Sequence, residues 1–582
     1  MLQKPYPTLA PLGRTFICRR SSLRALSGVT GVTGRVTRVT NGWPEGVTGE
    51  FPQSAEKVSR GRFGRKRAKI ASISQSPDPE GEFLMTRRLY LILLADALLL
   101  LALASDGVTA RNRPYPNLDA VDRYVERQMA ANRVPGLALA ITRGDQVVYL
   151  KGYGTAGNGE PVTPRTQLYT ASLSKGFTAI AVMQLVEEGK VKLDEPVRTY
   201  LPGFATADQR LSDTITVRQL LNQTSGLADS GFPAYTLPQP DSLEERVESL
   251  RTAKLLSEPG TEFHYTDPNY AVLARLVEVA SGKPFCGYLR ARIFGPLDMD
   301  DTTSVLTSEE APRVSPNLAQ GHVLAFGVPI KRGEMDGFLG GSGGVISTAG
   351  DMANYLIMQN NRGRFGNADL VSPESVALMH TPPRGIGSSY AMGWTAPDGA
   401  KPRVVEHNGV LSAFHADAAL LPNEGYGVVL LYNQSYALAD YEGIKQGLLD
   451  LLEGKRPDNG GLDAGTIGII LAALTLLTTT IQVRGLLRLP RWAAKTRGTP
   501  VWRLAPGIAW KFVPAVLLVG LQPLVASFAG RVFSYPQLFW AMPDVVAWLM
   551  LGAALSGAAG AARVFAVARR TTAGTRSGAD GG

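Results

Sequence analysis

Three long apolar segments near the C-terminus constrain the fold of this chain more than any other feature. They are Thr466–Val483, Phe512–Phe528 and Val545–Ala562. Each is close to the roughly 18–20 residues that a helix needs to cross the hydrocarbon core of a bilayer. We therefore predict three transmembrane helices within residues 466–568. The alternative for these segments is a buried helical hairpin of a soluble protein.

The basic residues around these segments predict their orientation. The first loop carries six of them and the chain after the third segment carries four, whereas the loop between the second and third segments carries only Arg531. Cytoplasmic loops are enriched in Lys and Arg. We therefore expect the first loop and the tail 569–582 to be cytoplasmic, and everything before Thr466 to lie outside. A transporter would need a network of ionisable residues within the membrane, whereas Lys511 and Asp544 stand near segment ends. The predicted role of the helices is therefore to anchor the protein.

The N-terminal region predicts that the domain after it is exported. Residues 85–104 combine Met85-Thr-Arg-Arg, an apolar run from Leu89 to Ala104 and an Ala-Leu-Ala ending before Ser105, which is typical of a secretory signal peptide. An uncleaved signal anchor is a second interpretation, and a buried helix of the folded domain is a third. Residues 1–84 are rich in Gly, Ser, Thr and Arg without useful periodicity, which indicates a disordered leader or an over-extended translation start.

The charge distribution argues against a nucleic-acid partner. The 582-residue chain has a net charge of +10, but residues 1–84 carry +8, residues 464–582 carry +10, and the middle carries −8. A nucleic-acid-binding face would need the basic charge on the folded part. The two cysteines, Cys18 and Cys286, exclude a disulfide framework, and the five histidines lack metal-ligand spacing. We therefore expect no metal and no organic cofactor.

Residues 105–455 predict a domain of the α+β class. The expected elements are a helix at Val121–Met129, strands at Leu137–Ile141 and Gln146–Tyr153, a hairpin formed by Phe414–Leu421 and Tyr426–Tyr432, and a closing helix at Tyr436–Leu452. Helices then flank an antiparallel sheet built from both ends of the domain, with an all-helical subdomain inserted between them. A polar linker, about 456–465, leads to the apolar segments.

Ser172 and Lys175 form the candidate catalytic pair. They are three residues apart and would share one face of a helix. A serine at a helix N-terminus has backbone N–H groups beside it, which suit a developing oxyanion. A lysine one turn later can take the serine proton if burial and neighbouring charge keep it neutral.

Two further motifs come later along the chain, in order. They are Phe263-His-Tyr265-Thr-Asp267-Pro-Asn-Tyr270 before a helix, and Val405-Glu-His407-Asn-Gly409-Val410 before a strand. With Ser172-Leu-Ser-Lys175 they make the sequence, from about Val121 to Leu452, resemble the serine β-lactamase and penicillin-binding-protein superfamily. The resemblance is to its class C-like branch, which includes esterases, D-aminopeptidases and DD-peptidases.

The resemblance implies a role for each matching residue. Ser172 would be the nucleophile and Lys175 its proton acceptor, while Tyr265 would pass the proton to the leaving group. The backbone N–H groups of Ser172 and Val410 would form the oxyanion hole. Gly409, which lacks a side chain, would let substrate approach the strand closely.

Two positions depart from the family pattern. Asp267 stands where the family usually has Asn, and its negative charge favours the protonated form of Lys175, so Lys175 becomes a poorer base. The alternative role for Asp267 is a helix N-cap before Pro268. His407, the fourth candidate catalytic residue beside Ser172, Lys175 and Tyr265, replaces the Lys of Lys-Thr-Gly. It is mostly neutral at pH 7, so it would bind a substrate carboxylate weakly.

The sequence thus predicts a membrane-anchored, exported serine hydrolase that acts on esters or amides, with weak or absent β-lactamase activity. The expected partners are a small-molecule or peptide substrate, with cell-wall fragments among the candidates, and the lipid bilayer. One alternative is a penicillin- or peptidoglycan-binding sensor that is acylated without turnover. Another is a Gly-x-Ser-x-Gly hydrolase that uses Ser342 with Asp351 and His407, although no strand pattern precedes Ser342.

Overall fold

The computed structural model describes residues 117–577, apart from residues 158, 398–402 and 458–460. The predicted leader, 1–84, and the predicted signal peptide, 85–104, lie outside the described residues. Both therefore remain predictions.

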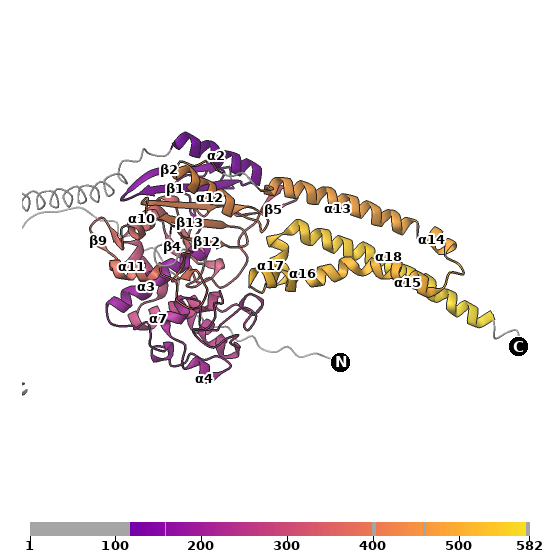
Figure 1. Cartoon of the computed structure of the whole chain (residues 1–582), viewed down its shortest axis with the longest axis horizontal. Coiled ribbons are helices and arrows are strands. Elements are labelled where there is room, and N and C mark those ends of the chain that lie inside the picture. The colour runs from indigo at the N-terminus through magenta and orange to yellow at the C-terminus, as the bar shows by residue number, and fades with distance from the viewer. Residues whose placement is uncertain (1–116, 158, 398–402, 458–460, 578–582) are drawn as a thin grey trace, which may run out of the picture. The chain divides into compact units, whose positions relative to one another are not determined.

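A seven-stranded antiparallel sheet forms the centre of the domain (Figure 1). Its order is β10-β11-β12-β13-β14-β1-β2. The strands are β10 (Tyr390–Ala391), β11 (Trp394–Thr395), β12 (Val405–Val410), β13 (His415–Leu421), β14 (Tyr426–Tyr432), β1 (Gly136–Arg143) and β2 (Gln146–Gly154). Leu139 of β1 pairs with Leu430 of β14, so both ends of the domain meet within one sheet, as the sequence predicts.

Helices cover both faces of this sheet. On β1, Leu137, Leu139 and Ile141 pack into a cluster with α2 (Leu118–Asn132) and α12 (Tyr441–Leu452). The alternating Ala138 and Ala140 belong to the core on the opposite face, where α10 (Ala349–Asn360) lies against β1 and β14. Because side chains of a strand alternate between faces, one apolar run supplies both cores.

The helical part of the domain is built around α3 (Ser174–Glu187). Every residue of α3 from Ser174 to Leu185 is buried, which suits a helix that is apolar on all sides. The other helices of the domain are α4 (Gln209–Ser212), α5 (Val217–Leu221), α6 (Leu243–Ser249), α7 (Asp267–Ser281), α8 (Phe285–Leu289), α9 (Ala311–Val314) and α11 (Pro373–Met379). The predicted α+β class with a helical insertion is confirmed.

Short strands form three further small sheets in the domain. They are β3 (Leu168–Tyr169), β4 (Thr303–Ser304) and β7 (Val345–Ser347) in one small sheet, β5 (His322–Ala325), β6 (Val328–Lys331) and β15 (Gln434–Ser435) in a second, and β8 (Arg364–Phe365) and β9 (Ala368–Asp369) in a third. The closing helix α12 begins at Tyr441, five residues after the predicted Tyr436. The difference arises because residues 437–439 form a turn, and Asp440 then caps the helix.

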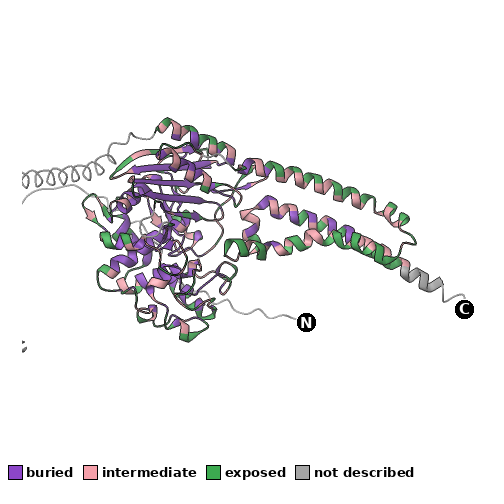
Figure 2. Cartoon of the chain, viewed as in Figure 1, coloured by how far each residue is buried: buried purple, intermediate pink, exposed green. Residues whose placement is uncertain are grey.

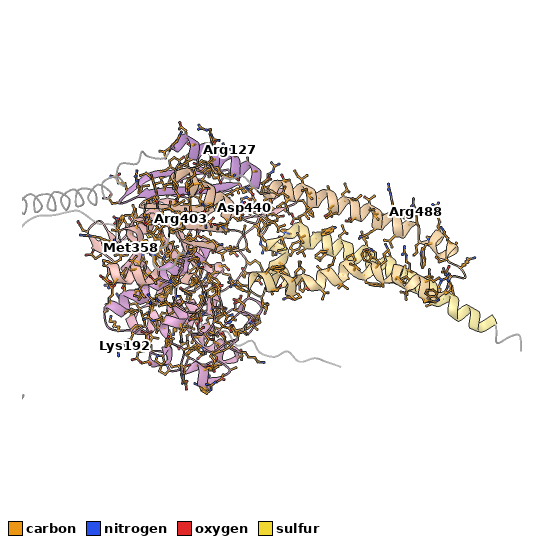
Figure 3. All side chains as sticks on the ribbon, in the orientation of Figure 1. Arg127, Lys192, Met358, Arg403, Asp440 and Arg488 are labelled. Carbon is orange, nitrogen blue, oxygen red and sulfur yellow. The ribbon has the colours of Figure 1, made fainter. Side chains whose placement is uncertain are left out.

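The C-terminal region is helical and contains three continuous helical stretches that are long and apolar enough to cross a membrane, the second of which comprises α15 and α16. These candidate spans cover 464–487, 501–529 and 543–570, and they are mostly unburied in the structure, in contrast to the sheet (Figure 2). The helices are α13 (Ala464–Leu487), α14 (Leu489–Lys495), α15 (Val501–Ala509), α16 (Val513–Ala529), α17 (Tyr535–Ala541) and α18 (Pro543–Ser577). Arg488, labelled in Figure 3, comes directly after α13. The three apolar helices are consistent with membrane association.

Candidate active site

Ser172 lies in a tight turn at the start of the central helix. The turn is a 3₁₀ segment, Ala171–Leu173, and α3 begins immediately after it at Ser174. Ala171 has a φ of 48°, in the left-handed region that a residue with a side chain seldom adopts. Ser172 is partly exposed, whereas its neighbours on both sides are buried. The turn therefore presents the Ser172 hydroxyl at the surface of an otherwise buried segment.

Lys175 is fully buried directly beneath this hydroxyl. Its Nζ donates to Ser172 Oγ at 3.0 Å, to Asp267 Oδ1 at 2.6 Å and to the backbone carbonyl of Ser342 at 3.0 Å. A lysine ammonium has three donors, and these three acceptors satisfy all of them. The predicted pair of Ser172 and Lys175 is thus brought together within hydrogen-bonding distance.

The charge state of Lys175 is set by its surroundings. Burial alone would lower the pKa of Lys175, but the Asp267 carboxylate and then Tyr265 raise this pKa above its ordinary value. Burial alone would likewise raise the pKa of Asp267, whereas Lys175 and Arg531 hold it well below its usual range. Asp267 therefore favours the charged form of Lys175, in the direction that the sequence predicts.

Asp267 does not serve as the N-cap of the helix beside it, so that alternative is wrong. The cap position is Thr266, and Asp267 is the first residue of α7. Its carboxylate is directed into the site, where Oδ2 accepts from the Tyr235 hydroxyl and from Arg531 Nη2, the latter at 2.7 Å. These contacts explain why Asp267 is unavailable to the helix terminus.

Tyr265 lies on the other side of Lys175. Its ring centroid is 4.9 Å from Lys175 Nζ. The same ring stacks on His407, with centroids 6.2 Å apart, and meets the edge of Tyr390 at 5.6 Å. The structure therefore groups three of the predicted residues, Lys175, Tyr265 and His407, around one point.

His407 occupies β12 with a side chain that is only 5% exposed. Burial, together with Lys175 and Lys445, lowers the pKa of His407 to about 3. Its Nδ1 has no hydrogen-bond partner among the residues that the structure describes. The imidazole is therefore neutral at pH 7, and its weak attraction for a substrate carboxylate stays a prediction.

Gly409 brings β12 against the turn that carries Ser172. A Cβ atom at Gly409 would lie 2.5 Å from the Thr170 carbonyl oxygen and 3.0 Å from the Ser172 backbone nitrogen. The sequence predicts that the missing side chain admits substrate, and the structure adds that it admits the protein's own backbone. Val410 is the last residue of β12 and is exposed, so the role of its N–H in an oxyanion hole remains a prediction.

The Gly-x-Ser-x-Gly segment reaches the site through its backbone. Ser342 is buried, and the nearby strand β7 comes after it rather than before it. The Asp351 carboxylate accepts from the Thr302 hydroxyl and from the Asp301 N–H, and among the described residues it makes no hydrogen bond to His407. The carbonyl of Ser342 instead accepts from Lys175, so this segment forms a wall of the site around Ser172.

Three polar residues of this site, Arg531, Tyr235 and Asp229, are not predicted from the sequence. Arg531, in the loop after α16, contacts Asp267, Tyr235 and Asp229. Tyr235 and Asp267 also line a small pocket with Arg246, Phe338 and Ser342, among others. The available signal is that Arg531 is the only basic residue between the second and third apolar segments. In the part of the chain that the structure describes, no cluster of His, Cys, Asp or Glu is placed to hold a metal.

Comparisons with known proteins identify the family of the domain. The profile of the family described as Beta-lactamase matches residues 121–452. The chain is similar to "Penicillin-binding protein 4" of Amycolatopsis lactamdurans, with 30% identity over 56% of this chain and 87% of the relative. It is also similar to "D-alanyl-D-alanine-carboxypeptidase/endopeptidase AmpH" of Escherichia coli, with 28% identity over 58% and 90% of the two chains. A solved structure of an octameric penicillin-binding protein homologue from Pyrococcus abyssi matches with a TM-score of 0.50 and 26% identity, over 59% of this chain and 79% of that one.

Proposed function

This chain belongs to the beta-lactamase family, whose members are generally serine hydrolases, and on that premise we propose that it hydrolyses esters or amides through an acyl-enzyme on Ser172. The observation that carries the proposal is the 3.0 Å contact between the buried Lys175 Nζ and the partly exposed Ser172 Oγ. A nucleophile and a proton acceptor at this separation are what covalent acyl transfer requires.

The contacts of the site suggest how the protons move. As Ser172 Oγ bonds to the substrate carbonyl carbon, its proton passes to Lys175, which must first have lost one of its own. Tyr265, with its ring 4.9 Å from Lys175 Nζ, is the proposed route of a proton to the leaving group as the scissile bond breaks. Water then hydrolyses the acyl ester on Ser172 and releases the acid. The backbone N–H groups of Ser172 and Val410 would stabilise the oxyanion in both steps.

We propose that neutral esters or amides are better substrates than β-lactams. Both β-lactams and peptides that end in D-Ala carry a carboxylate, and the buried, neutral His407 offers it no permanent charge. The D-alanyl-D-alanine cleavage in the name of the Escherichia coli relative makes cell-wall peptides a substrate class to include in a screen.

We also propose that the domain faces away from the cytoplasm. The loop between α16 and α17 contacts the site, since Arg531 reaches Asp267 and Asp229. If α16 and α18 both cross the bilayer, this loop lies on the same side as the domain. The positive-inside bias independently assigns that side to the exterior, because the six basic residues of the preceding loop lie on the other side.

Steady-state hydrolysis of a short-chain aryl ester by the detergent-solubilised full chain tests the function. We expect Ser172→Ala to reduce kcat/KM by about 10⁴-fold or more, while the matched Ser342→Ala variant keeps most of the activity. A faster rate with a cephalosporin than with the ester would contradict the substrate preference. A stable adduct on Ser172 without turnover would instead favour a sensor.

A further inference from the structure

Arg531 connects the apolar C-terminal helices to the active site. It comes after Gly530, whose φ of 64° ends α16 and turns the chain toward the domain. Its Nη2 lies 2.7 Å from Asp267 Oδ2 and 3.1 Å from the Tyr235 hydroxyl, and its Nε lies 3.0 Å from Asp229 Oδ2. The side chain is only 19% exposed, so these are enclosed contacts rather than a surface ion pair.

The four charged groups alternate in sign. Lys175 pairs with Asp267, Asp267 pairs with Arg531, and Arg531 pairs with Asp229, which is 1% exposed. The set is neutral as a whole. Without Arg531, two enclosed carboxylates would share the single positive charge of Lys175, and the set would carry a net charge of −1.

The helices that follow the loop, α17 and α18, contact the domain without involving Arg531. The Ala437 N–H donates to the Ala541 carbonyl oxygen at 2.8 Å, and the buried Tyr436 hydroxyl donates to Asp544 Oδ2 at 2.7 Å. The Arg332 guanidinium lies 3.7 Å from the ring centroid of Trp540. The position of the loop against the domain therefore does not depend on the ion pair alone.

We infer that Arg531 is a positioning residue of the active site, which pairs with Asp267 and so limits the negative charge that Asp267 presents to the proton acceptor Lys175. This inference rests on the proposed function of Ser172 and Lys175. The C-terminal region then has two roles: it anchors the domain, and through Arg531 it contributes a residue to the active site. Lys175 can then act as a base although Asp267 stands in place of the family's usual Asn, because the positive charge of Arg531 compensates the negative charge of Asp267.

The pH dependence of these four charged residues reflects the titratable groups around them. Those around Lys175 are Asp267, Tyr265, Tyr270 and the neutral His407. Those around Arg531 and Asp267 are Asp229, Tyr235, Tyr265 and Arg246. Removing Arg531 removes one positive charge from this set, so the pKa of Lys175 must rise. Since Lys175 acts only when neutral, the rising limb of the pH–rate profile must then move to higher pH.

The test is the rate of Ser172 acylation by an uncharged fluorophosphonate, measured against pH with the full chain in detergent. We expect Arg531→Gln to move the rising limb upward by about 1 pH unit. Arg531→Lys, which keeps the charge but can reach only one of the two carboxylates, should fall between Arg531→Gln and the wild type. The matched control, Arg488→Gln after α13, should leave the limb in place, and thermal unfolding of each variant reports its folding.

A double-variant cycle shows whether Arg531 acts through Asp267. In an Asp267→Asn background, Arg531→Gln should move the limb by much less than in the wild-type background. An unchanged limb in Arg531→Gln, or an equal shift in both backgrounds, would overturn the inference. If Arg531→Gln does not fold, an Arg531→Lys limb identical to that of the wild type would overturn it. Failure of the wild-type chain to be acylated would instead overturn the proposed function.

Discussion

The charge on Lys175 depends on its neighbours more than on its burial. A lysine enclosed without a partner would lose its proton readily, but here Asp267 lies 2.6 Å from Nζ and opposes that tendency. Arg531 in turn offsets Asp267. Asp267 acts directly on the charge of Lys175, the proposed proton acceptor, and Arg531 acts on it through Asp267.

His407 should not titrate in the working range of the enzyme. Because its pKa is lowered to about 3, the imidazole is neutral above about pH 4 in the folded protein. His407→Gln, whose side chain is also neutral, should therefore leave the pH dependence of kcat/KM between pH 5 and 8 unchanged. The measurement is ester hydrolysis across that range, and the loss of a titration in the variant would show that His407 carries charge there.

Sequence alone could indicate the residues of the site but not all of their partners. Ser172 and Lys175 are three apart on one chain segment, so local geometry brings them together. Tyr265 and His407 could be placed beside them only through the family resemblance. Arg531 is separated from Asp267 by 264 residues and lies in a segment expected only to anchor the protein, so no periodicity or spacing connects them.

At the scale of elements, the site depends on how closely β12 approaches the turn before α3. The two meet at Gly409, where a Cβ would lie 2.5 Å from the Thr170 carbonyl oxygen, closer than a side chain tolerates, and 3.0 Å from the Ser172 nitrogen. The left-handed Ala171 on the opposing turn shows that the backbone is constrained from both sides.

Adding a single methyl group at this contact should slow catalysis without unfolding the protein. We expect Gly409→Ala to displace β12 from the turn and to reduce the rate of Ser172 acylation by about 10²-fold. Gly287→Ala in α8 is the matched control, since nothing lies within 4 Å of its added Cβ. Acylation rates equal to those of the wild type in Gly409→Ala would show that the separation of β12 from Ser172 is not critical.

Long elements could be predicted from sequence and short ones could not. The apolar runs at β1, β13 and β14 and the helical spacing of α2 indicate their element types, because many residues contribute to each pattern. The two-residue strands β10 and β11 carry no pattern, yet they complete the sheet beside β12. The predicted start of α12 is wrong because the apolar residues 437–439 form a turn, and the helix begins only after its cap residue, Asp440.

At the scale of the whole molecule, the proposal unites a hydrolase domain with a membrane segment that contributes to its site. This requires the domain and the loop between α16 and α17 to lie on one side of the bilayer, and the loop between α14 and α15 on the other. The charge bias of the apolar region predicts the same arrangement.

Cysteine labelling in intact cells tests this topology. In a Cys18→Ser background, where the remaining Cys286 is buried, Lys192→Cys should react with an impermeant maleimide. Thr499→Cys, between α14 and α15, should react only after the membrane is permeabilised. The reverse pattern would place the domain in the cytoplasm and would contradict the proposed orientation.

The most direct test of the proposed chemistry is peptide mass spectrometry of the full chain after treatment with a fluorophosphonate. We predict a single covalent adduct on the peptide that contains Ser172, with none on the peptide that contains Ser342. An adduct located on Ser342 or on any other residue, with Ser172 unmodified, would contradict the assignment of Ser172 as the nucleophile.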